Sequence, residues 1–188
     1  MPTLRTSRGA LVTDPDVPHL ILVGLPGSGK STVGQQVAER LNRAFLDLDA
    51  EIERREGMSI MDIFGAKGEG YFRDRERELT EELRSFGRMV LAPGGGWAAD
   101  PERVGLLRPP GKLLYLKVKP ETALLRLGGD TGLRPLLSRP DPKGELRRLL
   151  EERQTAYESA DLVVDTERVD LKGVVDRVVA LASPHVAG

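Results

Sequence analysis

The stretch GLPGSGKST, residues Gly24 to Thr32, carries the strongest local signal in the chain. It follows the apolar run HLILV at 19–23 and precedes a segment whose apolar residues at 33, 37 and 41 recur at helical spacing. Gly24, Gly29, Lys30 and Ser31 satisfy the pattern G-x-x-x-x-G-K-S/T between a strand and a helix. The pattern predicts a loop whose backbone N–H groups hold the phosphates of a nucleotide. The alternative is a glycine-rich turn without a ligand.

Within this loop the residue types have distinct expected roles. Lys30 reaches the β- and γ-phosphates, and the Ser31 hydroxyl is a ligand for Mg²⁺. The residues expected to bind the nucleotide are Gly27, Ser28, Gly29, Lys30, Ser31 and Thr32. The loop therefore predicts ATP or a close relative as a ligand, without saying what the phosphate is used for.

Composition narrows the functional class. The chain has 188 residues, the size of one domain, with 28 Lys and Arg against 29 Asp and Glu, interspersed. This balance argues against nucleic acid as a partner. Without cysteines the chain has no disulfides and no thiol chemistry. Its apolar runs are too short to cross a membrane, and residues 1–18 have no apolar signal segment. We therefore expect a cytoplasmic protein without a membrane partner.

Short apolar strands alternate with helical patterns along the rest of the chain. This order predicts an α/β fold with a parallel sheet covered by helices on both faces. The expected strands are 19–23, 43–49, 89–92, 112–118 and 161–165, and the expected helices include 51–56, 60–65, 69–86, 101–107, 120–127, 145–159 and 171–181. We predict a flexible tail at 1–17 and a single domain at 18–184. The irregular stretch 128–143, rich in glycine and proline, is expected to be a mobile lid.

Asp47 and Asp49 end the second expected strand, at the sheet edge where open α/β sheets bind ligands. Side chains two residues apart on a strand share a face, so both carboxylates are expected to face one cleft. One would serve Mg²⁺ and the other a substrate hydroxyl. The alternative makes one of them a helix N-cap and the other a solvated charge.

Several later residues are candidates for binding an anion. Arg153 lies on the apolar stripe of its helix with Leu146, Leu149 and Tyr157, so it needs either a substrate carboxylate or an internal ion pair. Arg73, Arg134 in the expected lid and the glycines at 94–96 each have a functional reading and a structural one, which the residues alone leave open. Trp97, the single tryptophan, either lines a cleft or packs in the core.

In this order the motifs resemble the shikimate kinase family, small P-loop kinases with a core, a substrate-binding region and a lid. The matching stretches are GLPGSGKST at 24–32, FLDLD at 45–49, GMSIMDIFGAKGEGYFR at 57–73, GGG at 94–96, LRLGGD at 125–130, LRPLL at 133–137 and EERQTAY at 151–157. The resemblance covers about residues 19–181. It implies a three-layer P-loop kinase fold with five parallel strands, a substrate-binding region at about 49–77, and a monomer that phosphorylates shikimate for aromatic amino acid biosynthesis.

The resemblance also implies roles for individual residues. It makes Lys30, Asp49 and Arg134 the catalytic set, with Asp49 on the substrate hydroxyls and Arg134 closing over the transferring phosphate. It places Asp47 with Ser31 at Mg²⁺, and Arg126 with Arg134 at the nucleotide. Shikimate would be bound by Asp49, Arg73, Gly95, Gly96 and Arg153, the two arginines holding its carboxylate. Pro93 and Trp97, a larger residue than is usual in the family, are departures beside the expected acceptor site.

Two other functions are compatible with the same pattern. A kinase for another acidic polyol, such as gluconate, would share the loop and the lid. A regulatory nucleotide-binding module would keep the fold without turnover, but it would have no need of Arg73 and Arg153.

Overall fold

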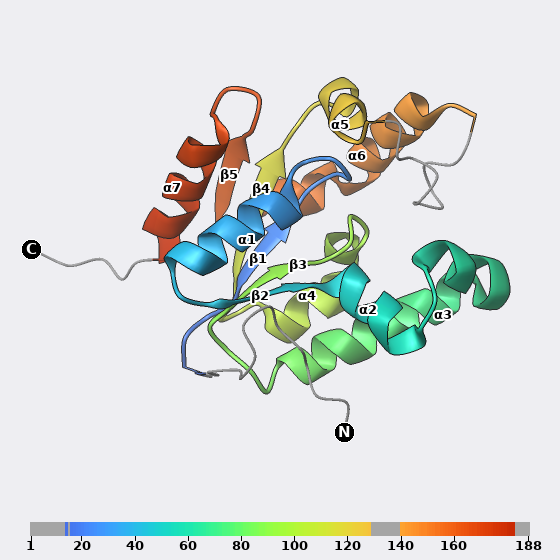
Figure 1. Cartoon of the computed structure of the whole chain (residues 1–188), viewed down its shortest axis with the longest axis horizontal. Helices are drawn as coiled ribbons and strands as arrows, with labels where there is room; N and C mark the ends of the chain where they lie inside the picture. Colours follow the sequence, from blue (N-terminus) through green and yellow to red (C-terminus); the bar gives the residue numbers. More distant parts are fainter. Residues whose placement is uncertain (1–13, 15, 129–139, 183–188) are drawn as a thin grey trace, which may run out of the picture.

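The computed structural model describes residue 14 and residues 16–128 and 140–182. Its centre is a sheet of five parallel strands in the order β2-β3-β1-β4-β5 (Figure 1). The strands are β1 (Leu20–Val23), β2 (Ala44–Asp47), β3 (Met89–Ala92), β4 (Lys112–Lys117) and β5 (Leu162–Asp165). The predicted five-stranded parallel α/β fold is confirmed.

Helices cover both faces of the sheet (Figure 1). The helices are α1 (Lys30–Arg40), α2 (Leu48–Glu56), α3 (Ile60–Leu83), α4 (Pro101–Leu107), α5 (Pro120–Arg126), α6 (Pro142–Glu158) and α7 (Leu171–Ala182), with a short 3₁₀ turn, η1, at Trp97–Ala99. In the part of the chain that the structure describes, no helix combines the length and apolar character needed to span a membrane.

The central strand β1 shows how the sequence builds three layers. All four of its residues are buried. Leu20 and Leu22 pack with α1 and α7 on one face, whereas Ile21 and Val23 pack with α3, α4 and α6 on the other. Because side chains alternate along a strand, a continuous apolar run gives both faces a core.

One expected boundary was wrong, and one expected break between helices is present as a kink. The second strand ends at Asp47 instead of Asp49, because the Asp47 carboxylate accepts a hydrogen bond from Ala50 N (3.1 Å) and caps a helix that begins at Leu48. The two helices expected at 60–65 and 69–86 are joined in α3, and the break expected between them is a kink at Gly68, whose dihedral angles are non-helical (φ 82°, ψ 167°). Ser59 caps its start through Asp62 N, as its position predicts.

The strand order places the key loops side by side. The loop at 24–29 follows β1, the segment 93–96 follows β3, and Asp47 ends β2. These are three neighbouring strands of the sheet, and their carboxyl ends lie at the same edge because the strands are parallel. Helices α2 and α3 flank this edge on one side, and α5 and α6 on the other (Figure 1).

His19 fastens the entry to this central strand. Its Nδ1 accepts a hydrogen bond from Met89 N (3.3 Å), and its Nε2 then donates to Leu83 O (3.1 Å). Burial lowers the pKa of His19, an effect that its backbone hydrogen bonds partly offset. The folded chain therefore holds His19 as the neutral imidazole, with its proton on Nε2.

This arrangement predicts that folding stability falls in mild acid. Since the folded-state pKa lies below the unfolded value of 6.5, the contribution of His19 is complete above pH 6.5 and is lost as the pH falls through the folded-state pKa. Protonated Nδ1 can no longer accept from Met89, a loss of about 1–3 kcal/mol for one buried group without a partner. Urea unfolding at pH 7.5 and at pH 5 measures this difference in the free energy of unfolding.

The two histidines of the chain supply matched variants. His19→Asn keeps an acceptor near the Nδ1 position and does not titrate, so it should flatten the pH dependence. His185→Asn should leave that dependence unchanged. Equal pH dependence in the His19→Asn variant and the unmodified chain would contradict a role for His19.

Candidate active site

The loop after β1 is built to hold phosphate. Lys30 begins α1, and its Nζ donates to Gly24 O (2.9 Å) and Leu25 O (3.0 Å), which keeps the ammonium over the loop. Gly29 precedes the helix with a φ of 91°, in the left-handed region that glycine adopts without strain. At Gly27 a side chain would come within 2.4 Å of Ala123 O, so the loop lies directly against α5.

Ser31 and Asp47 form an oxygen pair beside this loop. The Ser31 hydroxyl donates to Asp47 Oδ2 (2.7 Å), while Asp47 Oδ1 accepts from Ala50 N. A hydroxyl and a carboxylate are the hard oxygen ligands that Mg²⁺ prefers, and Mg²⁺ usually takes few ligands from the protein. The described residues contain no group of three or more acidic, His or Cys side chains arranged for a metal. The pair therefore fits Mg²⁺ of the kind that is shared with phosphates.

Each glycine at 94–96 faces a different predicted substrate-binding side chain. A Cβ on Gly94 would lie 2.7 Å from Asp49 Oδ1, one on Gly95 3.1 Å from an Arg153 nitrogen, and one on Gly96 3.0 Å from an Arg73 nitrogen. These three side chains come from α2, α6 and α3. We call residues Gly94–Gly96 the glycine loop. Its lack of side chains lets three helices bring functional groups to one point.

Asp49 reaches this site from the first turn of α2, not from a strand. The prediction that Asp47 and Asp49 share a strand face is wrong, because Asp47 ends the strand and caps the helix. Both carboxylates nevertheless line the same two pockets. The N-cap alternative holds for Asp47, which caps α2 and also accepts from Ser31.

Arg153 is buried on the apolar stripe of α6, as its spacing predicts, and is only 7% exposed. Within residues 14, 16–128 and 140–182, no carboxylate lies within 4.0 Å of its guanidinium. A buried cation without an internal counter-ion is costly unless a ligand supplies the charge. This geometry favours the carboxylate-binding reading over the internal ion pair.

Arg73 is held by an acid that the sequence reading did not single out. Its Nη1 donates to Glu76 Oε2 (2.6 Å), and Arg103 of α4 donates to the same oxygen. Glu76 is completely buried. Arg73 also donates from Nη2 to Glu69 Oε1 (2.9 Å). Burial alone would lower the pKa of Arg73, but the attraction and hydrogen bonds of Glu76 and Glu69 outweigh it and raise that pKa above its usual value. The i, i+3 spacing of Arg73 and Glu76 on a helix was the available signal.

Two adjoining pockets meet at these residues. The larger, of about 700 Å³, contains Arg73, Arg153 and the glycine loop, with an apolar wall that includes Ile60, Phe64 and Phe72. The smaller, of about 370 Å³, is lined by the phosphate loop, including Gly27, Gly29, Lys30, Ser31 and Thr32. Asp47, Asp49, Gly94, Arg126 and Leu127 line both. The arrangement suits two substrates that meet at the aspartates.

Trp97 packs in the core and lines neither pocket. It is fully buried, and its Nε1 donates to Thr80 Oγ1 (3.0 Å), whose hydroxyl donates to Glu76 O (2.6 Å). The indole thus ties the glycine loop to α3. Pro93 lines the smaller pocket. Of the two departures from the family pattern, Pro93 therefore borders a pocket and Trp97 does not.

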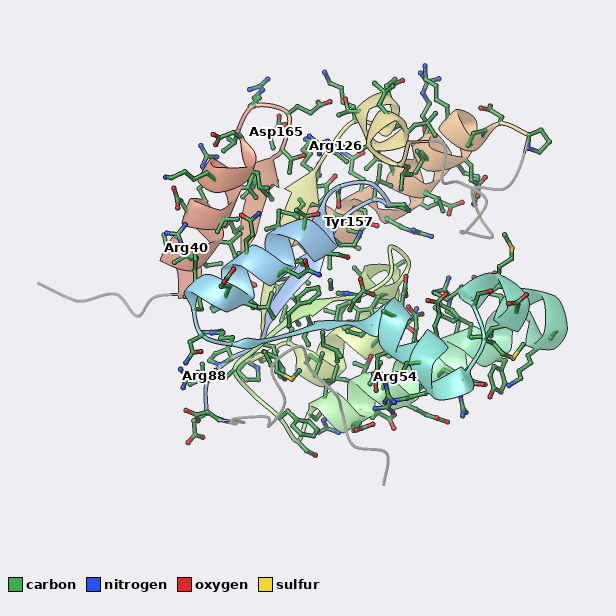
Figure 2. All side chains as sticks on the ribbon, in the orientation of Figure 1. Arg40, Arg54, Arg88, Arg126, Tyr157 and Asp165 are labelled. Carbon is green, nitrogen blue, oxygen red and sulfur yellow. The ribbon has the colours of Figure 1, made fainter. Side chains whose placement is uncertain are left out.

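Of the remaining predicted residues, Ser28 is buried within the phosphate loop. Arg126 lines both pockets and donates from Nη1 to Thr166 Oγ1 (2.8 Å) and from Nη2 to Thr166 O (2.9 Å). Figure 2 labels it at the end of α5. Arg134 and most of the predicted lid lie outside the described residues.

Comparison with known proteins identifies the family. The family model described as shikimate kinase matches residues 26–182. The chain belongs to the shikimate kinase family. It is 45% identical to shikimate kinase of Burkholderia thailandensis over 166 residues. This match covers 88% of this chain and 89% of that protein. The chain is 39% identical over 160 residues to shikimate kinase of Sulfurihydrogenibium, with 85% and 95% coverage.

Solved structures agree with this membership. Shikimate kinase from Acinetobacter baumannii in complex with shikimate has a TM-score of 0.83 at 38% identity, covering 89% of this chain and 93% of that one. A gluconokinase from Sinorhizobium meliloti has a TM-score of 0.56 at 23% identity, covering 88% and 91%. The second likeness shows a common fold alone. The chain is thus a kinase of the shikimate kinase family with the predicted P-loop kinase fold.

The glycine loop yields a specific prediction. Gly94→Ala should lower kcat/KM for the acceptor about tenfold or more, because the new Cβ would displace the Asp49 carboxylate from its position at the junction of the pockets. Steady-state kinetics at saturating ATP measure the loss. Gly105→Ala is the control, since a Cβ added to that helical glycine would meet no atom of a neighbouring residue within 4 Å. Equal activity of the two variants would refute the steric role of Gly94.

Proposed function

We propose that this chain transfers the γ-phosphoryl group of ATP to the 3-hydroxyl of shikimate, giving shikimate 3-phosphate and ADP. ATP-dependent shikimate phosphorylation is the activity of the family to which the chain belongs. The observation that carries the assignment of its residues is the convergence of Asp49, Arg73 and Arg153 on the glycine loop. It joins two cations and one carboxylate beside a phosphate loop.

The larger pocket supplies complementary chemistry for an acidic cyclohexene polyol. Arg73 and Arg153 hold the substrate carboxylate, and the Gly95 and Gly96 amides add donors. The apolar wall of Ile60, Phe64 and Phe72 suits the ring. With the carboxylate fixed at one end, the hydroxyls at the other end lie toward Asp49.

Asp49 acts on the acceptor hydroxyl. Its carboxylate lines both pockets and therefore lies where acceptor and donor meet. The Asp49 carboxylate accepts a hydrogen bond from the hydroxyl and so orients it. It then takes up the hydroxyl proton as the new O–P bond forms. Phosphoryl transfer depends chiefly on positioning and on charge stabilisation, so no covalent protein nucleophile is needed.

Residues of the smaller pocket hold the donor. Lys30 and the backbone amides of the phosphate loop bind the ATP phosphates, and Arg126 borders the nucleotide. Ser31 and Asp47 hold Mg²⁺, which neutralises phosphate charge when it is bound. Arg134, in the predicted lid, adds a positive charge at the transferring phosphate as the lid excludes water.

Other features of this proposal come from the sequence. The near-equal numbers of acidic and basic residues favour a small-molecule substrate over nucleic acid. The monomeric state, the cytoplasmic location and the division into a tail and a single domain stay predictions.

An acceptor panel tests the proposal. The purified chain is incubated with MgATP and shikimate, quinate or gluconate, and phosphorylated products are identified by mass spectrometry and ³¹P NMR. We expect shikimate 3-phosphate in amounts that match ADP release, with kcat/KM for shikimate at least tenfold above that for the other two acids. ADP release that does not depend on shikimate, or a higher kcat/KM for gluconate than for shikimate, would contradict the proposed function.

Arg153 separates acceptor binding from donor binding. Arg153→Ala should raise KM for shikimate about 10- to 100-fold, because it removes a charge-assisted contact worth about 1.5–3 kcal/mol. KM for ATP should change less than about threefold. Arg148→Ala, an arginine on the same helix that lines neither pocket, is the control. If KM for shikimate and KM for ATP rise by similar factors and Tm falls, Arg153 has a structural role instead.

A further inference from the structure

The glycine loop is held from behind by a tyrosine. The Tyr157 hydroxyl donates to Gly95 O at 2.6 Å. Tyr157 is fully buried on α6, one turn after Arg153, and its ring stacks on Tyr115 of β4 with centroids 5.0 Å apart. Figure 2 labels Tyr157 on this helix. One face of α6 therefore contacts Gly95 twice, through the Arg153 nitrogen beside its α-carbon and through Tyr157 at its carbonyl.

Every carbonyl of the glycine loop has a donor. Gly94 O accepts from Trp97 N (3.0 Å), Gly96 O accepts from Ala99 N (3.3 Å), and Gly95 O accepts from Tyr157. Two of these donors are backbone groups of the 3₁₀ turn that follows. Tyr157 is the side-chain donor of the three. Buried backbone groups seldom lack a hydrogen-bond partner. The Tyr157 hydroxyl supplies one to Gly95 O, which accepts no hydrogen bond from the 3₁₀ turn.

The Gly95 and Gly96 N–H groups differ from the carbonyls in this respect. Among the described residues, neither Gly95 N nor Gly96 N donates to a carbonyl or a side chain. The peptide between Gly95 and Gly96 is trans, so its C=O and N–H point in opposite directions. With the carbonyl fixed on Tyr157, which lies outside the pocket lining, the Gly96 N–H points away from the Tyr157 hydroxyl, and Gly96 itself lines the larger pocket.

We propose that Tyr157 is a positioning residue: its hydroxyl holds the Gly95 carbonyl so that the Gly96 N–H faces the larger pocket as a donor to the substrate carboxylate between Arg73 and Arg153. Tyr157 itself does not touch the substrate. This inference rests on the proposed function, because it gives the oriented amide the carboxylate of shikimate as its acceptor.

The hydroxyl suits this role chemically. Burial raises the pKa of Tyr157, and Arg153 lowers it only in part, through its positive charge and a hydrogen bond to the phenol oxygen. The phenol therefore stays protonated and remains a donor at neutral pH. Because the ring is packed against Tyr115 inside the core, the position of its oxygen is fixed by side-chain packing on both α6 and β4.

Tyr157→Phe removes the oxygen and keeps the stacked ring. We expect kcat/KM for shikimate to fall about 5- to 20-fold, mainly through KM, since one buried hydrogen bond is lost and the amide is no longer oriented. KM for ATP should stay within about twofold of its original value. Tyr115→Phe is the matched control, because it removes the other hydroxyl of the same ring stack, and among the described residues no hydrogen bond joins Tyr115 to the glycine loop.

A second measurement separates positioning from general loss of stability. In protein labelled with ¹⁵N-glycine, the Gly96 amide resonance should shift on adding shikimate. Tyr157→Phe should displace that resonance in the unliganded chain and reduce the shikimate-induced shift, whereas Tyr115→Phe should do neither. Tm is measured for both variants, and Tyr157→Phe is expected to lower it more than Tyr115→Phe, because it removes the hydrogen bond to Gly95 O.

Three results would overturn the inference: unchanged shikimate KM in Tyr157→Phe, equal effects of the two tyrosine variants, or equal loss toward shikimate and ATP. Failure of the proposed function has a different signature. In that case the unmodified chain itself would not phosphorylate shikimate, whereas failure of the inference alone leaves the unmodified chain active and gives one of the three results above.

Discussion

Close packing at the glycine loop is the constraint on which the active site depends. Three glycines in succession let the backbone approach side chains from three helices so closely that an added Cβ would push the Asp49, Arg153 or Arg73 side chain out of its place. Conformational freedom is not the main reason for glycine at Gly96, whose φ is −89°. The reason is space, because Asp49, Arg153 and Arg73 occupy the positions that side chains of the loop would take.

The parallel sheet makes this approach possible. Neighbouring strands β2, β3 and β1 deliver Asp47, the glycine loop and the phosphate loop to one edge, so the donor and acceptor pockets share a wall. Behind this edge, buried polar contacts fix the positions of Arg73 and of the glycine loop. Glu76 joins Arg73 to Arg103, Trp97 joins the loop to Thr80, and Tyr157 donates to Gly95 O. Such contacts are strong because water does not compete for them.

Local patterns in the sequence predicted much of this architecture. The strand, glycine-rich turn and helix around Lys30 are encoded by neighbouring residues, and so is the apolar stripe that buries Arg153. The Asp47 boundary was missed because its carboxylate serves as both strand end and helix cap, and either reading fits the local sequence. The role of Glu76 was missed, and the two alternatives for Trp97 stayed open, because their partners are set by the packing of α3 against α4 and η1. Whether Arg153 has an internal counter-ion likewise depends on residues distant in sequence.

A crystal structure of the chain with shikimate and a non-hydrolysable ATP analogue would show directly whether the glycine loop organises the acceptor site. We expect the shikimate carboxylate to contact Arg73, Arg153 and the Gly96 amide, with the ring hydroxyls at Asp49 and the γ-phosphate over Lys30. A carboxylate bound away from both arginines, or an Arg153 that pairs with a protein carboxylate in the complex, would contradict this arrangement.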